Sequence, residues 1–257
     1  MTIAELPQRG ALFEYLLRLA DDRLVLGHRL SEWCGHGPIL EEDIALANIS
    51  LDLIGQATLM LTLAGETEGK GRNEDALAYF REAVDFRNLQ IVELPNGDYA
   101  FTIARQFLFD VHSYHVLEQL QRSTHQELAG IAAKGFKEVR YHVRHSSEWI
   151  LRMGDGTEES HTRVQKALDH LWRFTPEMFV TDSVDDEMLA AGAGADLVAV
   201  KQEWEAVIRD VVSRATLSLP ADEAMMGGGR KGRHTEYLGH MLSEMQIVAR
   251  SHPGAEW

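Results

Sequence analysis

The chain has 257 residues, of which 45% are apolar and 25% charged, a composition typical of globular proteins that excludes collagen-like and disordered classes. Acidic residues outnumber basic ones by 40 to 25, so the formal net charge is −15 and no nucleic-acid partner is expected. The single cysteine, Cys34, excludes an intramolecular disulfide and a cysteine-rich metal site.

The first long helix is predicted from apolar residues that recur at a 4-3-7-4-3 spacing between Leu12 and Trp33 and therefore share one helical face. It ends at the Gly-His-Gly-Pro run 35–38, since glycine ends helices and proline cannot continue them. A second helix is predicted over 41–63, with acidic residues in the first turn, where the helix dipole favours them. A shorter amphipathic piece follows at 74–87, then long helices at 99–122 and 127–153 and helical segments at 158–179, 196–218 and 235–249.

These elements predict an all-α fold. Strand patterns are nearly absent, the linkers at 190–195 and 219–233 are Gly-rich, and nothing in the composition marks a second domain. We therefore expect a single domain over 1–257, built as an antiparallel bundle of four long helices with additional helices around it. The N-terminus contains no signal-peptide pattern, and no run of about 18 apolar residues lacks a charge. A cytoplasmic protein with no membrane segment is expected.

Each of the four long helices carries an acidic residue near its middle, on or beside the apolar stripe: Asp22, Asp52, Asp110 and Glu138. Four carboxylates that converge inside a bundle are the layout of ferritin-like di-iron proteins, in which two Glu-x-x-His motifs supply histidine ligands. Here that pattern fails, because Gly55 stands three residues after Asp52 and Tyr141 three residues after Glu138.

The chain has other histidines that could take the place of the missing ligands. His142 stands four residues after Glu138, which rotates it by about 100° from the i+3 position. We interpret His142 and His145 as core histidines hydrogen-bonded to carboxylates of neighbouring helices, and metal ligation by His142 as the alternative. The one literal Glu-x-x-His, Glu158 to His161, is interpreted as a solvated helix start. His112 and His115 are interpreted as surface or interface residues.

Several segments, in order over nearly the whole chain, resemble the PaaC-type structural subunits of the multicomponent ring 1,2-phenylacetyl-CoA epoxidases. They are LVLGHRLSEWCGH (24–36), ALANISLDLIGQA (45–57), LPNG (94–97), TIARQ (102–106), KEVRYH (137–142), LWRFT (171–175), GGRKGRHTE (228–236) and LSEMQ (242–246), with a terminal tryptophan at 257. This resemblance implies a ferritin-like fold.

The resemblance also implies a function. The complex inserts one atom of O2 across the aromatic ring of phenylacetyl-CoA in aerobic phenylacetate catabolism. A sister subunit of the same fold holds the two irons and binds substrate, and NADPH supplies electrons through a flavin and iron–sulfur reductase. This chain would pair with that catalytic subunit, bind no cofactor and contain no catalytic residue, with Gly55 and Tyr141 standing where histidine ligands would be.

Without iron, the four carboxylates would repel one another unless they are neutralised, solvated or paired with a cation. Arg23, His142 and His145 are the candidates, and we expect a polar network of these residues to fill the vacated metal site.

The Gly-rich loop 219–233 contains the one basic island of the chain, with Arg230, Lys231 and Arg233. These cations either contact an acidic patch of a partner or of this chain, which we favour, or bind an anion such as a CoA phosphate. Met225 and Met226 are expected in the core, and Cys34 is expected to be buried and inert.

Three hypotheses follow from the sequence. The first is a metal-free structural subunit. The second is a di-iron oxygenase in its own right that uses the four carboxylates and the shifted His142. The third is a CoA-ester binding module that rests on the basic loop alone.

Overall fold

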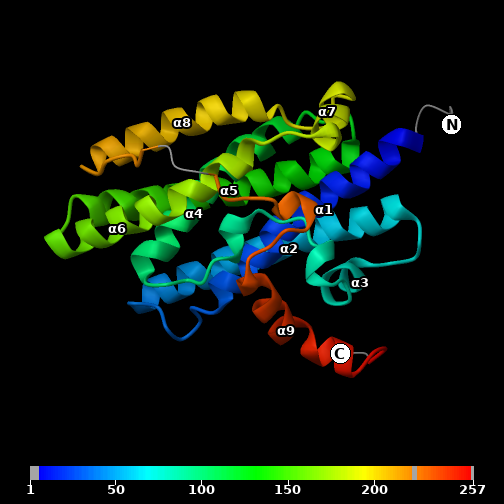
Figure 1. Cartoon of the computed structure of the whole chain (residues 1–257), viewed down its shortest axis with the longest axis horizontal. Helices are drawn as coiled ribbons and strands as arrows, with labels where there is room; N and C mark the ends of the chain where they lie inside the picture. Colours follow the sequence, from blue (N-terminus) through cyan, green and yellow to red (C-terminus); the bar gives the residue numbers. More distant parts are fainter. Residues whose placement is uncertain (1–5, 222–224, 256–257) are drawn as a thin grey trace.

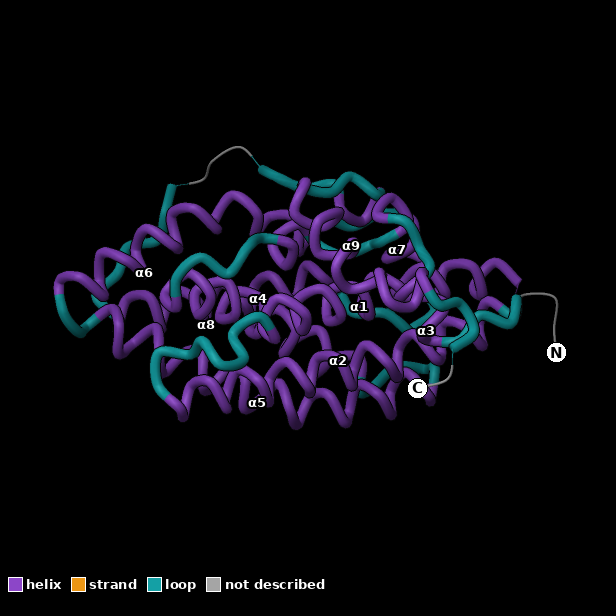
Figure 2. Tube along the Cα trace, turned by 90° about the horizontal axis from the view of Figure 1, so that it is seen from below, coloured by secondary structure: helices purple, strands orange, loops and turns teal. Residues whose placement is uncertain are grey.

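The computed structural model describes residues 6–221 and 225–255, and the elements within these ranges are helical, with no strand among them (Figure 1, Figure 2). The all-α prediction is therefore confirmed. The four long helices are α1 (Leu6–Ser31), α2 (Leu40–Glu68), α4 (Tyr99–Leu120) and α5 (Gln126–Gly154). α1 packs along α2, α4 packs along α5, and α2 and α5 join the two pairs. This is the four-helix core of a ferritin-like bundle.

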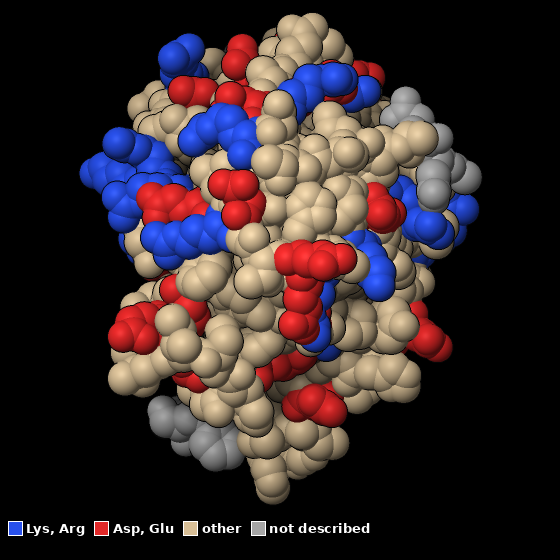
Figure 3. All heavy atoms as spheres, turned by 90° about the vertical axis from the view of Figure 1, so that its left-hand side faces the viewer, with Lys and Arg blue, Asp and Glu red and all other residues tan. Residues whose placement is uncertain are grey.

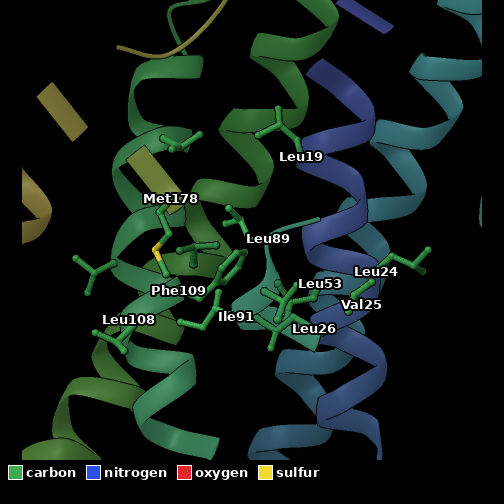
Figure 4. Close-up of a cluster of buried hydrophobic side chains, with 14 of the residues drawn as sticks. Leu19, Leu24, Val25, Leu26, Leu53, Leu89, Ile91, Leu108, Phe109 and Met178 are labelled. Carbon is green, nitrogen blue, oxygen red and sulfur yellow. The ribbon is translucent and has the colours of Figure 1, made fainter. Parts of the chain in front are cut away.

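The two pairs are connected by a crossover, residues 69–98, which contains α3 (Glu74–Tyr79) and the short 3₁₀ turns η2 (Ala83–Asp85) and η3 (Gln90–Glu93). Leu89 and Ile91 of this crossover are fully buried, and Figure 4 shows them between α1 and α4, close to Leu26 and Phe109. The crossover therefore covers one side of the bundle and closes the apolar core there.

The remaining helices cover the outside of the bundle. α6 (Glu158–Leu171) and α8 (Leu197–Arg214) pack on α4, and the 3₁₀ segment η4 (Trp172–Phe179) follows α6 directly. The loop after α8 contains the 3₁₀ turn η5 (Gly229–Lys231), and α9 (Glu236–Ser251) contacts α3 and η2 and extends away from the body of the bundle (Figure 1).

Two elements differ from the prediction for local reasons. α2 continues beyond residue 63 to Glu68 and is capped by Gly69, which adopts a left-handed conformation (φ 71°) and donates its N–H to the carbonyl of Gly65. The short helix α7 (Ser183–Ala190) has no counterpart in the prediction. Its N-cap Asp182 accepts from the N–H of Val184, and Arg18 of α1 donates hydrogen bonds to Asp182 and Asp185, so a tertiary ion pair holds this short helix.

α2 is long and apolar enough, by length and composition alone, to cross a bilayer, and half of its most apolar window is buried in the protein. Its buried side packs on α1 and α5. The position of α2 inside the bundle accounts for its apolar composition, so this helix is no indication of a membrane segment.

Candidate functional site

A continuous chain of hydrogen bonds crosses the interior of the bundle and includes one side chain from each long helix. Arg23 of α1 donates from Nε to Oε1 of Gln56 on α2 (2.9 Å) and from Nη2 to Oγ of Ser113 on α4 (2.9 Å). Gln56 in turn donates from Nε2 to Oε2 of Glu138 on α5 (2.8 Å). The centre of the bundle is therefore held together by a guanidinium and an amide.

Arg23 is the cation at the centre of this chain of hydrogen bonds. Its Nη1 donates to the carbonyl of Leu19 (2.8 Å), so each of its three nitrogens has a partner. Burial lowers the pKa of Arg23 to about 10, and the neighbouring Asp22 opposes that shift, so the side chain stays charged at neutral pH. The prediction placed Arg23 in this interior but did not include Gln56 or Ser113.

Gln56 fits because Gly135 faces it from α5. A Cβ at position 135 would lie 3.1 Å from the Cδ of Gln56, so a larger residue there would press against the amide. Gln56 stands four residues after Asp52, one position beyond Gly55. The inward face of α2 therefore continues at i+4 and not at the i+3 spacing that the di-iron motif requires.

The same one-residue offset occurs on α5. His142, four residues after Glu138, is fully buried, whereas Tyr141 is 40% exposed. On α2, a Cβ at Gly55 would meet no atom within 4 Å. Gly55 and Tyr141 thus lie on the outward side of their helices, away from the hydrogen-bonded interior.

The two inward histidines of α5 contact carboxylates of α2. His142 Nε2 lies 3.0 Å from Oδ2 of Asp52, and His145 Nε2 lies 2.8 Å from Oε2 of Glu42. The phenol of Tyr99 donates to the same Glu42 oxygen (2.6 Å), and burial, followed by this bond, raises the pKa of Tyr99. Glu42 was not among the predicted site residues. It lies three residues before Ala45 on the inward face of α2, but its place in the first turn suggested only a favourable helix-dipole interaction.

Asp110 is a buried carboxyl held by neutral donors. Gln106 donates from Nε2 to Oδ1 (2.6 Å), and the Ser146 hydroxyl donates to Oδ2 (3.0 Å). Burial raises the pKa of Asp110 to about 7, although nearby His142 and the two hydrogen bonds lower it. The carboxyl is therefore partly neutral near physiological pH.

The expected convergence of four carboxylates is wrong, and Asp22 shows this most clearly. It is 2% exposed and accepts from the N–H of Leu89 in the crossover (2.7 Å) and from Arg230 in the loop before α9. Burial raises the pKa of Asp22, and Arg230 opposes the shift. Asp22 lies on the side of α1 that the crossover and the loop before α9 cover. Both of these segments are far from α1 in sequence.

Residues 228–230 of the basic loop are bound to the bundle. Arg230 also donates to the carbonyls of Arg18 (3.0 Å) and Arg87 (2.6 Å), and Glu177 accepts from the N–H groups of Gly228 and Gly229. Arg230 thus contacts an acidic group of this chain and is not available to a CoA phosphate. Lys231 and Arg233 are exposed.

Other sequence interpretations are corrected by the structure. His112 and His115 are buried, because α6, α8 and η4 cover the outer side of α4. The His112 ring packs against Phe179, and burial lowers the pKa of His112 to about 3. Cys34, in the turn after α1, is exposed, as are Met225 and Met226.

The one literal Glu-x-x-His, Glu158 to His161, lies at the start of helix α6. Glu158 is exposed at the first position of α6, after the Thr157 cap, and His161 Nδ1 lies 2.7 Å from the carbonyl of Gly154. The two side chains are therefore not arranged as a ligand pair.

Residues 6–221 and 225–255 contain no group of three or more His, Cys, Asp or Glu side chains that could hold a metal ion. Asp52, Asp110 and Glu138 each hydrogen-bond to a different partner, and Arg23 and Gln56 lie among the helices that carry them. These residues do not fit a di-iron centre, which needs carboxylates that bridge two metals and a histidine for each.

The surface does not present one broad charged field on the side shown in Figure 3, where basic and acidic side chains are interspersed.

Comparisons with known proteins agree with the fold and with the sequence segments quoted above. Residues 3–257 match the family model described as phenylacetic acid catabolic protein. The chain is 47% identical over 246 residues to the C subunit of the 1,2-phenylacetyl-CoA epoxidase of Escherichia coli (strain K12), covering 96% of this chain and 99% of the relative. The chain therefore belongs to the phenylacetic acid catabolic protein family.

Proposed function

We propose that this chain is the non-catalytic structural subunit of a phenylacetyl-CoA 1,2-epoxidase, which pairs with a di-iron catalytic subunit and stabilises it. The epoxidase assignment rests on similarity to a relative whose name describes a component of that enzyme. The non-catalytic role rests on one observation, the hydrogen-bond chain in which Arg23 joins Ser113 to Gln56 and Gln56 continues to Glu138, so that all four bundle helices are linked.

The chemistry of that interior supports a structural role. A guanidinium repels metal cations, and an amide is a weak ligand compared with the histidine that the di-iron motif requires. The hydrogen-bonded network instead fixes how the four helices pack, since each buried polar group must find its partner. A rigid bundle of this kind suits a subunit whose task is to present a surface.

In this proposal other subunits of the complex carry out the reaction. The two irons are held by the catalytic subunit, and NADPH supplies electrons through a flavin and iron–sulfur reductase. The chain works in the cytoplasm, where its exposed Cys34 stays reduced.

The experiment is to purify the chain alone, the catalytic subunit alone and the two co-expressed, and to measure iron and association for each. We expect iron in the catalytic subunit and in the complex, no stoichiometric iron in the isolated chain, and a stable complex on size-exclusion chromatography. Near-stoichiometric iron in the isolated chain that is lost in Asp110→Asn and Glu138→Gln would overturn the proposal in favour of a di-iron oxygenase with a shifted ligand set.

A further inference from the structure

One face of α2 carries a seam of side chains that is largely exposed, although Thr62 at its end is half-buried and donates a hydrogen bond to Glu74 of α3. The seam consists of Ile44, Asn48, Leu51, Gly55, Thr58 and Thr62, which a 4-3-4-3-4 spacing places on one side of the helix. Ile44 and Leu51 are its large apolar residues. Ile44 is 52% exposed and Leu51 66% exposed, and Leu40, one turn before the seam, is 71% exposed. Such spacing keeps one stripe facing a partner helix over several turns.

The seam becomes a groove toward the C-terminal half of α2. An open cavity of about 390 Å³ lies between α2 and α5 and is lined by Leu59, Thr62, Gly130 and Ile131, among others. A Cβ added at Gly55 or at Gly130 would meet no atom within 4 Å, so both glycines leave space on this surface. Large side chains at one end and small residues at the other suit the ridge-and-groove packing of helices.

The flank of this seam on α5 has more exposed cations than exposed carboxylates, which are Glu127 and Glu148. Lys137, Arg140 and Arg144 are exposed, and none of them has an ion-pair partner in the described ranges 6–221 and 225–255. The exposed cations of α8 differ, since Lys201 and Arg209 both pair with Glu205 of the same helix. Unpaired cations are unexpected in a chain of net charge −15, and they predict a partner with carboxylates at matching positions.

We propose that the α2–α5 face, defined by the seam and by the three cations of α5, is the surface on which this chain binds the catalytic subunit. The occupant is a helix of that subunit, which lies along α2 with apolar side chains against Ile44 and Leu51. Its carboxylates face Lys137, Arg140 and Arg144. This inference rests on the proposed function, because it names the surface through which the two subunits pair.

Two other occupants fit the surface less well. A second copy of the chain would bring the same three unpaired cations and would not supply a dedicated acidic flank. A bilayer needs a broad apolar area, but here the exposed aliphatic residues form a narrow stripe that includes Asn48 and Thr58.

The test compares variants of this face with matched variants of α8. Leu51→Glu places a charge in the seam. The triple change Lys137→Glu, Arg140→Glu and Arg144→Glu reverses the charge of the flank on α5. The controls are Val198→Glu, at a valine that is 64% exposed, and the triple change Lys201→Glu, Arg209→Glu and Arg214→Glu. All these positions are on the surface, so circular dichroism should match the wild type. The α8 triple variant also breaks the ion pairs with Glu205 and Asp210, so it should unfold at a slightly lower temperature while its affinity is unchanged.

Affinity for the purified catalytic subunit is measured by calorimetry at low and at high NaCl concentration. We expect Leu51→Glu and the α5 triple variant to bind at least about tenfold more weakly, as for central interface residues, while both controls bind like the wild type. The affinity of the wild type should fall with salt, and that of the α5 triple variant should not fall.

The outcomes separate the two proposals. If the wild type does not bind the catalytic subunit, the proposed function fails. If the wild type binds and both α2–α5 variants bind equally well, the assignment of this face is wrong while the pairing stands. It is also wrong if Leu51→Glu abolishes only self-association in light scattering, or only co-sedimentation with phosphatidylcholine–phosphatidylglycerol vesicles.

Discussion

Arg230 and Asp22 form a two-point ion pair, with Nη1 to Oδ1 at 3.0 Å and Nη2 to Oδ2 at 2.8 Å. The two residues are 208 positions apart, and their contact joins the loop before α9 to the middle of α1. Asp22 is 2% exposed and the Arg230 side chain 18% exposed. The pair therefore holds the turn η5 against the bundle and neutralises a carboxylate inside it.

Removal of the arginine should be costly. Arg230→Gln leaves the Asp22 carboxylate buried without its cation, so we expect the free energy of unfolding to fall by about 3 kcal/mol. Urea unfolding at neutral pH measures this. Lys231→Gln, at the exposed neighbour, should change stability by less than about 0.5 kcal/mol. The double variant Asp22→Asn with Arg230→Gln should recover much of the loss, and a double variant as unstable as Arg230→Gln alone would contradict the ion-pair explanation.

Asp110 should give the protein a stability that depends on pH. Burial raises its pKa in the folded state to about 7 from an ordinary value of 3.8, so between these pH values the folded state binds more protons than the unfolded state. The contribution of Asp110 to stability is therefore largest at low pH and falls as the pH rises from about 4 to 7.

Asp110→Asn mimics the neutral carboxyl, since the amide can still accept from Gln106 and bond to Ser146. We expect this variant to gain on the order of 3 kcal/mol over the wild type between about pH 4 and pH 8 in urea unfolding. Asp210→Asn, at an exposed carboxylate of α8, is the control. A difference between Asp110→Asn and wild type that stays constant over this pH range would show that Asp110 titrates normally.

Two glycines should respond in opposite ways to alanine. At Gly229 the carbonyl oxygen of Asn88 occupies the space that a Cβ would need, so Gly229→Ala should displace the loop and cost about 2 kcal/mol. At Gly239, inside α9, a Cβ would meet no atom within 4 Å. Gly239→Ala should therefore stabilise the protein by about 0.5 to 1 kcal/mol through helix propensity. Thermal unfolding of both variants checks this, and equal effects would show that the loop is not packed against Asn88.

Cys34 should be accessible in the native protein. Because it lies exposed in the turn after α1, a thiol reagent such as dithiobisnitrobenzoate should label one thiol per chain without denaturant. Cys34→Ser should leave the free energy of unfolding unchanged within about 0.5 kcal/mol. Labelling that requires urea would mean that the turn is covered in solution.

The helical elements and their inward faces could be predicted because they depend on local spacing. The 3.6-residue period of apolar side chains places Asp110 and Glu138 on or beside the buried stripes, and it shows that positions 55 and 141 lack histidines. Local spacing does not predict α7, which depends on Arg18 of a distant helix, or the burial of His112, which α4 alone would leave on the surface.

The pairing of polar groups was decided only by the tertiary structure. Arg23 meets Gln56 and Ser113, and Asp22 meets Arg230, because of how the helices cross and how the crossover and the last loop cover α1. The periodicity of one helix shows on which face a side chain lies. A hydrogen bond between separate segments also needs two atoms within about 3 Å of each other, which periodicity does not determine. The sequence by itself therefore determined an all-α bundle with carboxylates and no complete ligand motif, and the packing of distant segments decided that a buried arginine and an amide link its helices.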